Sequence, residues 1–299
     1  MTRPGARSAL LVTHTGRSSI LHVACQVQER LSRAGFTVRM LADEAKDLDA
    51  GEIEVVDADD HAADGAEIAI VLGGDGTFLR AAELTRPTGT PLLGVNLGHV
   101  GFLAEVEPEA LDDTVRHIVN REYAVEERLT LGVTVTVDGQ LTACDWALNE
   151  AVVEKRSPER MLEVVLEIDG RPLTSFGCDG VLCATPTGST AYAFSAGGPV
   201  VWPDVDALLV VPNSAHALFA RPLVIAPDST VAVVLHGDGD AGVLGCDGRR
   251  TALVPAGARV EVRRGRQPVR IARIYPSPFT DRLVAKFQLP VNGFRNRIG

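Results

Sequence analysis

The chain has 299 residues, 45% of them hydrophobic and 23% charged, which is typical of a globular protein with one large or two moderate domains. Its formal net charge of -10 argues against nucleic acid or an anionic membrane as the main partner, although local arginines can still bind a small anion. The five cysteines are scattered and no stretch reaches membrane-spanning length, so we expect a cytoplasmic protein with reduced thiols and neither a zinc site nor disulfides.

The first hundred residues alternate predicted strands and helices. A helix is predicted from Ser18 until Gly35 ends it, and another over 77–84. The acidic stretch 43–67 is expected to form loop and short helix on the surface. This alternation predicts a parallel sheet with helices on both faces, its strands at 9–13, 36–41, 68–72 and 91–96.

The character of the chain changes after a helix predicted around 108–120. Asp-Gly turns at 138–139, 169–170 and 247–248 separate short apolar runs, a pattern typical of antiparallel strands. We therefore predict an α/β domain over 1–107, joined by the tail 272–299, and a mainly antiparallel β domain over 108–271. Its strands are predicted at 131–137, 146–153, 162–168, 180–184, 207–211 and 231–235.

The strand at 68–72 runs into a glycine-rich corner that holds Asp75. Ligands of open α/β sheets bind at the carboxyl ends of strands, and a helix N-terminus between glycines favours phosphate. A carboxylate repels phosphate, so we interpret Asp75 as a base beside a phosphate site; the alternative is a helix N-cap. Neither G-x-x-x-x-G-K-[ST] nor G-x-G-x-x-G occurs at this corner.

Two further segments carry candidate chemistry. Asn149 and Glu150 lie in an apolar strand, where they need polar partners such as the hydroxyl groups of a ribose, unless they are a structural pair at a strand edge. The run 185–199 is rich in Thr, Ser, Gly and Ala, and its Tyr192 and Phe194 favour a ligand-contacting segment over a flexible linker. His99 and His216 are interpreted as structural, and a calcium loop before Gly248 is rejected because Arg249 stands where the closing Glu is needed.

Together these segments resemble the NAD kinase family of the bacterial type, and the amino-acid sequence of 212–218 resembles that of its actinobacterial branch. The resemblance covers almost the whole chain and rests on 73–77, Asn149-Glu150, 185–199 and 211–224. The glycine motif is shared with diacylglycerol-kinase-like and 6-phosphofructokinase-like enzymes, whereas the Thr/Gly/Ser run together with the Asn-Glu pair is more specific.

The resemblance implies the NAD kinase and diacylglycerol-kinase-like fold, and transfer of the γ-phosphoryl group of ATP to the 2′-hydroxyl of the adenosine ribose of NAD, giving NADP. Asp75 would be the base, helped by Mg²⁺ on the triphosphate, with metal ligands that the sequence does not identify. The implied substrate-binding residues are Gly74, Gly76 and Thr77 for phosphate, Asn149 and Glu150 for the acceptor's ribose and adenine, Asp179 for its nicotinamide half, Thr190, Ala191, Tyr192 and Ser195 for adenine, and Arg80, Arg160, Ser214 and Arg249 for further contacts.

The resemblance also implies a homo-oligomer, a dimer or tetramer. Gly177 stands where some relatives carry a basic residue, and use of NADH or polyphosphate stays open. The alternatives are a lipid or sugar kinase of the same superfamily and a non-catalytic dinucleotide sensor. A dehydrogenase is disfavoured because Thr13-His14-Thr15-Gly16 replaces the Rossmann fingerprint after the first strand.

Overall fold

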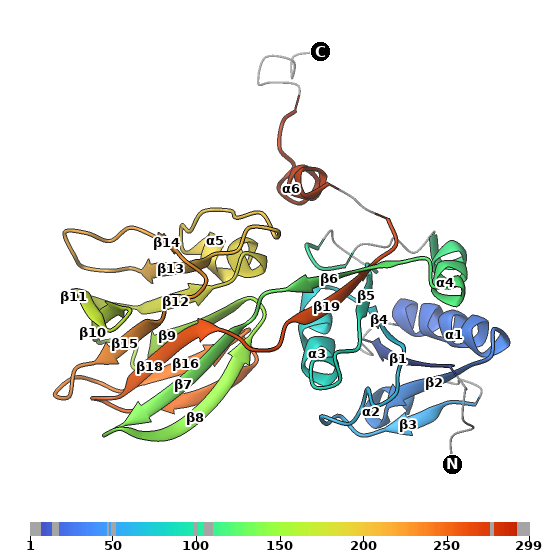
Figure 1. Ribbon diagram of the computed structural model, residues 1–299, viewed down its shortest axis with the longest axis horizontal. Helices are drawn as coiled ribbons and strands as arrows, with labels where there is room; N and C mark the ends of the chain where they lie inside the picture. Colours follow the sequence, from blue (N-terminus) through green and yellow to red (C-terminus); the bar gives the residue numbers. More distant parts are fainter. Residues whose placement is uncertain are drawn as a thin grey trace. The chain divides into compact units, whose positions relative to one another are not determined.

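The computed structural model describes residues 7–13, 18–46, 48, 52–97, 101–104, 110–275 and 278–291, and the chain divides into two compact units (Figure 1). The first unit comprises Met1–Glu127 and Val269–Gly299, and the second comprises Arg128–Pro268. The first unit thus extends to residue 127, beyond the predicted boundary at 107, because the helix and strand that follow 107 belong to it.

The first unit is built on a seven-stranded sheet of order β3-β2-β1-β4-β5-β19-β6. The pairs β2–β3, β1–β2, β1–β4, β4–β5 and β5–β19 are parallel. The parallel sheet was predicted from β1, β2, β4 and β5, whereas β3 and β19 were not predicted as strands of it. The strands are β1 (Arg7–Thr13), β2 (Phe36–Leu41), β3 (Glu54–Val56), β4 (Ile68–Leu72), β5 (Leu92–Val95), β6 (Ala124–Arg128) and β19 (Val269–Arg273).

Helices cover both faces of this sheet. On one face, α1 (Ser18–Arg33) and α4 (Leu111–Asn120) pack against alternate strand residues such as Leu11 and Ile70. On the other, α3 (Asp75–Thr85) lies so close that a Cβ at Gly94 would come within 3.1 Å of the Phe78 ring and 2.7 Å of the Ala104 backbone. Glycine at this position lets the segment 101–104 approach the start of α3.

The C-terminal tail forms α6 (Phe279–Phe287), which contacts the segment 101–104. The rings of Phe279 and Phe287 lie 5.9 and 5.8 Å from the Phe102 ring, and Arg282 donates a 3.1 Å hydrogen bond to the Phe102 carbonyl. The tail thereby helps to hold the backbone that faces Asp75.

The second unit consists of two six-stranded sheets, and every strand pair described in it is antiparallel. One sheet has the order β11-β10-β15-β18-β7-β8 and the other β14-β13-β12-β9-β16-β17. Its strands are β7 (Leu131–Val137), β8 (Gln140–Ala147), β9 (Glu150–Lys155), β10 (Leu162–Ile168), β11 (Arg171–Cys178), β12 (Gly180–Ala184), β13 (Leu208–Asn213), β14 (Leu223–Ile225), β15 (Val231–Leu235), β16 (Gly242–Cys246), β17 (Arg250–Val254) and β18 (Arg259–Arg264).

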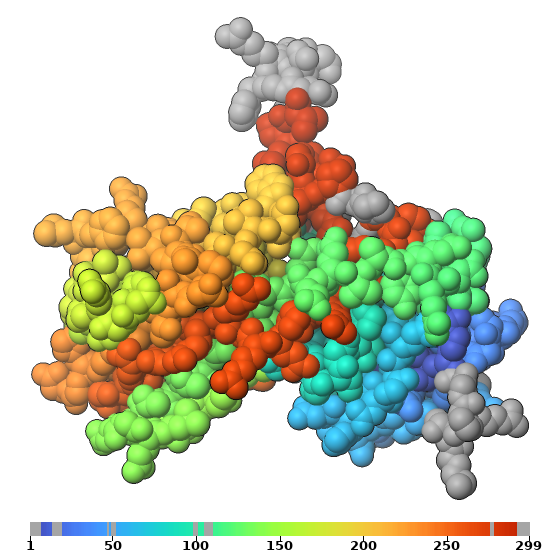
Figure 2. All heavy atoms as spheres, in the orientation of Figure 1, coloured from blue at the N-terminus to red at the C-terminus, as the bar shows by residue number. Residues whose placement is uncertain are grey.

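The two sheets share one apolar core, to which β9 contributes Ala151 and Val153. The residue between them, Val152, points to the opposite face of its sheet and packs with Leu182, Leu209 and Ala193. That outer face is covered by the short 3-10 helix η2 (Thr187–Thr190) and by α5 (Tyr192–Ser195), whose segment is yellow in Figure 2. The Thr/Gly/Ser-rich run 185–199 is therefore a folded segment that packs on the sheet, not a flexible linker.

Two of the sequence expectations need correction. The single strand predicted at 146–153 is wrong, because the chain leaves β8 of one sheet and enters β9 of the other, with a break at Leu148 and Asn149. The acidic stretch 43–67 contains α2 (Ala42–Ala45) and strand β3, and its Glu44 is buried instead of lying on the surface. His14, Gly16 and His99 lie outside the described residues.

All five cysteines are free thiols. Cys178, Cys183 and Cys246 are buried, Cys25 is half-buried and Cys144 is exposed. Among the residues described, no helix combines the length and apolar character needed to cross a bilayer.

Candidate functional site

Asp75 begins α3 at the carboxyl end of β4, where the parallel sheet predicts a ligand site. The N-cap of α3 is Gly74 and makes no side-chain cap, so the interpretation of Asp75 as a helix cap is wrong. Its carboxylate instead accepts hydrogen bonds from the backbone N–H groups of Phe102 (3.2 Å) and Leu103 (3.1 Å). The aspartate is thus half-buried and fixed against the segment 101–104.

The glycines around Asp75 fall into two groups. A Cβ at Gly73 would lie 2.6 Å from the Thr77 hydroxyl, and one at Gly101 would lie 2.5 Å from the Asp75 carboxylate, so both are required by close packing. Gly74 and Gly76 are exposed, and a Cβ at either would meet no atom of the described residues within 4 Å. Since the first N–H groups of a helix lack intrahelical acceptors, this open space suits an anion.

Arg80, one of the predicted contact residues, is held by a buried carboxylate of the same unit. Its guanidinium lies 2.8 Å from Glu44, whose other oxygen accepts the Thr13 N–H at 2.8 Å. Burial raises the pKa of the Glu44 carboxyl, while the hydrogen bond from Thr13 and the charge of Arg80 oppose the rise. Because Thr13 ends β1 and Glu44 follows β2, this pair places a cation at the carboxyl edge of the sheet.

Asn149 and Glu150 lie in the second unit at the break between β8 and β9, and they are only 7% and 6% exposed. One Glu150 oxygen is buried without a hydrogen-bond partner among the described residues. Burial and the nearby charge of Asp247 raise the Glu150 pKa to about 7, although a hydrogen bond from the Tyr192 backbone acts in the opposite direction. Such a group needs a further polar partner, which fits a ligand-binding role.

A second polar group lies at the other end of β9. Gly180, next to Asp179, pairs with Glu154 and Asn213, so the ends of three strands meet there. Lys155 lies 2.6 Å from the Asp179 carboxylate, and its hydrogen bond lowers the Asp179 pKa, with Ser214 contributing in the same direction.

Tyr192 joins these two groups across the outer face of the sheet. Its backbone N–H meets Glu150, and its hydroxyl donates to Glu154 at 2.6 Å while accepting a hydrogen bond from Asn213 at 3.3 Å. The bond to Glu154 raises the Tyr192 pKa to about 12. The neighbouring predicted residues Thr190, Ala191 and Ser195 lie on the same covering segment.

Two further predicted residues lie elsewhere in the second unit. Arg160 follows β9 and forms an ion pair with Asp240 at 3.6 Å. Arg249 lies in the turn between β16 and β17. Gly177 and His216 meet through a backbone hydrogen bond of 2.8 Å, so the position of Gly177 lies against the β13–β14 connection.

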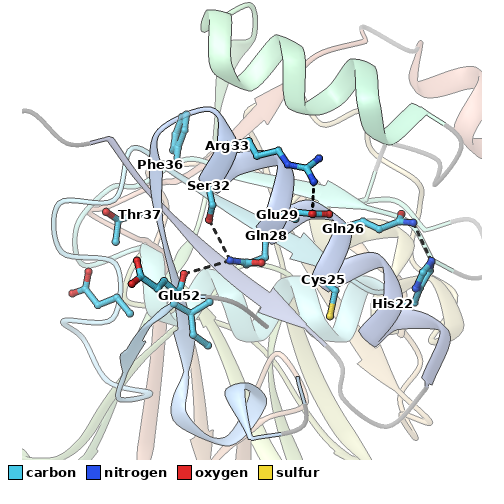
Figure 3. A pocket seen from close by; sticks show the side chains of 12 residues that line it. His22, Cys25, Gln26, Gln28, Glu29, Ser32, Arg33, Phe36, Thr37 and Glu52 are labelled. Atoms are coloured by element: carbon cyan, nitrogen blue, oxygen red, sulfur yellow. Dashed lines mark hydrogen bonds and ion pairs between the residues drawn. The ribbon is translucent and has the colours of Figure 1, made fainter. Parts of the chain in front are cut away.

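A pocket of about 1160 Å³ lies away from all predicted residues (Figure 3). It is lined by α1, by Phe36 and Thr37 at the start of β2, and by residues 52–54. Inside it Gln28 donates to Ser32 at 3.2 Å and to the Glu52 carbonyl at 3.3 Å. The amino ends of β2 and β3 are the opposite edge from the glycine corner, so the pocket is not the site expected for an open α/β sheet.

Comparison with known proteins identifies the family. The model of the ATP-NAD kinase N-terminal domain matches residues 9–123, and that of the ATP-NAD kinase C-terminal domain matches residues 148–274. The chain belongs to the ATP-NAD kinase family.

Relatives and solved structures agree with this assignment. The NAD kinase of Thermobifida fusca is 60% identical over 97% of this chain and 92% of its own, and NAD kinase 2 of Streptomyces coelicolor is 60% identical over 99% of both. The crystal structure of yeast NADH kinase complexed with NADH has a TM-score of 0.87 at 21% identity, covering 97% of this chain and 89% of its own. An NAD kinase from Archaeoglobus fulgidus in complex with ATP has a TM-score of 0.71 at 24% identity, covering 94% and 98%.

These findings confirm the predicted family, its actinobacterial branch, the α/β-plus-antiparallel fold and the assignment as an ATP-dependent NAD kinase. The NAD kinase motifs led to Asp75, Asn149 and Glu150, but sequence reasoning missed the buried carboxylates Glu44, next to Arg80, and Asp247, close to Glu150. Asp247 was interpreted only as a turn residue, since its burial depends on residues far away in the chain.

The raised Glu150 pKa makes the free energy of unfolding depend on pH. Folding raises this pKa from 4.5 to about 7, so the folded state binds more protons between these values and stability falls as pH rises through them. Between acidic pH and about pH 8, the free energy of unfolding of the wild type should fall by up to about 3 kcal/mol more than that of Glu150→Gln. Urea unfolding at a series of pH values measures this difference. Glu159→Gln, at an exposed turn residue, is the control, and parallel pH curves for wild type and Glu150→Gln would contradict the analysis.

Proposed function

We propose that Asp75 is the base that takes the proton of the 2′-hydroxyl of NAD while the γ-phosphoryl group of ATP is transferred to that oxygen, giving NADP. The observation that carries this proposal is the placement of Asp75. A fixed carboxylate lies at the carboxyl edge of a parallel sheet beside the open space at Gly74 and Gly76.

The hydrogen bonds of Asp75 support this role. An ionised carboxylate has about four lone-pair sites, and the N–H groups of Phe102 and Leu103 occupy two of them. Within the described part of the chain the others are left for a substrate hydroxyl, and the two backbone bonds restrict the orientation of the carboxylate. Phosphoryl transfer needs chiefly alignment and charge neutralisation, so an oriented carboxylate suffices as the acceptor of the proton.

Gly74, Gly76, Thr77 and Arg80 would bind the phosphates of ATP. The open space before α3 admits phosphate oxygens to the first N–H groups of the helix, and Glu44 holds the Arg80 guanidinium at the same edge. Within the described ranges no cluster of three or more His, Cys, Asp or Glu could hold a metal ion. Mg²⁺ would be bound mainly by the substrate phosphates and water, and it would neutralise triphosphate charge.

Residues of the second unit would bind NAD. Asn149 and Glu150 offer an amide and a partly unsatisfied carboxyl to ribose and adenine, and Thr190, Ala191, Tyr192 and Ser195 would line the adenine side. Asp179, oriented by Lys155, would face the nicotinamide half, with Ser214 beside it. Arg160 and Arg249 would make further contacts to the dinucleotide.

We further propose a cytoplasmic homo-oligomer. Large apolar side chains are exposed around the edge strand β14, namely Leu218, Phe219 and Val224, and association would cover them. Light scattering on the purified chain should give two or four times the monomer mass of 31.7 kDa. A monomer at micromolar concentration would contradict this proposal.

Removing the base should abolish turnover while NAD still binds. Asp75→Asn keeps the size of the side chain but cannot accept a proton, so we expect kcat to fall by about 10² to 10⁴ with the Kd for NAD nearly unchanged. The rate of NADP formation from ATP, Mg²⁺ and NAD gives kcat, and calorimetry gives the Kd for NAD. Asp113→Asn, at an exposed ion pair in α4, is the control, and wild-type turnover in Asp75→Asn would remove Asp75 from the mechanism.

Filling the open space before α3 should weaken ATP binding without harming the fold. In Gly76→Ala the new methyl group meets no protein atom, and alanine favours a helix by up to about 1 kcal/mol. We therefore expect an unchanged or higher Tm and a KM for ATP raised about tenfold, with the KM for NAD little changed.

Gly237→Ala is the matched control, because a Cβ there also meets no atom within 4 Å. If Gly76→Ala left the KM for ATP as it is in the control, the phosphate-binding role of this corner would be wrong.

A further inference from the structure

Three turns of the second unit share one sequence and one backbone geometry. Asp138-Gly139, Asp169-Gly170 and Asp247-Gly248 all have both residues in the left-handed region, with φ between 51° and 76°. Asp138 and Asp169 are exposed, as turn residues usually are, whereas Asp247 is only 6% exposed. A turn of this type does not require a buried carboxylate, so the burial of Asp247 needs a separate explanation.

Asp247 binds the backbone of the segment that carries Asn149 and Glu150. One carboxylate oxygen accepts the N–H of Leu148 at 2.9 Å, and the other accepts those of Asn149 at 2.7 Å and Glu150 at 3.3 Å. These amides lie at the break between β8 and β9, where the chain passes from one sheet to the other. Asp247 therefore supplies the acceptor that a neighbouring strand would otherwise provide.

Arg250 fixes Asp247 from the other side. Its guanidinium lies 3.3 Å from the Asp247 carboxylate, donates to Asp145 at 2.9 Å and to the Trp146 carbonyl at 2.6 Å, and lies 4.8 Å from the centre of the Trp146 ring. Since Asp145 and Trp146 belong to β8, the arginine ties the turn to the strand that leads into the break.

The same segment is held on its carbonyl side by Thr185. The Thr185 N–H donates to the Asn149 carbonyl at 2.9 Å, and its hydroxyl donates to the Leu148 carbonyl at 2.6 Å. A Cβ at Gly188 would lie 2.0 Å from the Asn149 oxygen, so the η2 turn also packs directly on this peptide. The backbone of 148–150 is thus held by Asp247 on its N–H side and by Thr185 on its carbonyl side.

We propose that Asp247 is a positioning residue for NAD: by binding the amides of Leu148, Asn149 and Glu150, it sets where the Asn149 and Glu150 side chains meet the acceptor ribose. This inference rests on the proposed role of Asn149 and Glu150. Asp247 itself does not touch the substrate.

The charge of Asp247 gives the proposal an independent readout. Among the described residues, Asp247, the Cys246 thiol and Tyr192 interact electrostatically with the Glu150 carboxyl. The Asp247 charge raises the Glu150 pKa, and the hydrogen bond from the Tyr192 backbone lowers it. Neutralising Asp247 should therefore move the titration of Glu150 to lower pH.

The test compares Asp247→Asn with Asp169→Asn in the full chain. Asp169 is the matched control, because it has the same turn geometry and accepts a backbone N–H, from Thr230 at 2.8 Å, but it is exposed. We expect Asp247→Asn to raise the KM for NAD about tenfold or more while the KM for ATP changes less than about twofold. Equal effects of the two substitutions on the KM for NAD, or an equal rise in both KM values, would overturn the proposal.

A second variant decides the question if Asp247→Asn does not fold. Arg250→Lys keeps the charge but cannot reproduce the contacts to Asp145 and the Trp146 carbonyl, so it should raise the KM for NAD in the same selective way, by about threefold. An unchanged KM for NAD in Arg250→Lys would then overturn the proposal.

The proposed function and the positioning role fail in different ways. Absence of NADP formation by the wild type would reject the function. The positioning role is also read without substrate, because the pH midpoint of stability assigned to Glu150 should move to lower pH in Asp247→Asn and stay unchanged in Asp169→Asn.

Discussion

A single buried carboxylate, that of Asp247, holds the backbone from which the side chains of Asn149 and Glu150 project. The chain crosses from one sheet to the other at Leu148 and Asn149, and at such a crossing no neighbouring strand can accept the backbone N–H groups. A buried N–H without an acceptor costs about 1–3 kcal/mol, and three of them meet Asp247. The same carboxylate therefore satisfies these N–H groups and fixes the position of Asn149 and Glu150.

The first unit uses carboxylates in a similar way. Asp75 accepts two backbone N–H groups from the segment 101–104, and Glu44 accepts the N–H of Thr13 while holding Arg80. Acidic groups near an anionic substrate repel it unless they are bound by donors, and here backbone amides and an arginine provide those donors. A chain with a net charge of -10 can thus present a local surface of N–H groups and cations to phosphate.

Continuous apolar runs made part of this fold predictable. The strands at 36–41, 68–72, 131–137, 162–168, 180–184 and 231–235 were predicted to the residue, because each is bounded by turn residues or polar neighbours. The break at Leu148 and Asn149 was not predicted, since apolar residues on both sides of Asn149-Glu150 favour one strand, and the change of sheet depends on tertiary pairing. The strand β11 was missed because Pro172 and Gly177 disfavour a strand and only pairing with β10 stabilises it. Asp75 and Asn149-Glu150 were found by motif, whereas the burial of Glu44 and Asp247 arises from tertiary partners.

Asp247 lies far along the chain from the backbone N–H groups of 148–150 that it accepts, and this separation has a consequence for folding. The hydrogen bonds that fix the Asn-Glu pair join residues 97 to 99 positions apart, and β9 acquires its neighbours β12 and β16 only after long loops have closed. Loop closure of this kind slows folding and comes after local hairpins such as β7–β8 have formed. During synthesis the Asn149-Glu150 pair would gain these hydrogen bonds only after the β16–β17 hairpin has left the ribosome and docked, so this pair would be among the last parts of the growing chain to reach its final position.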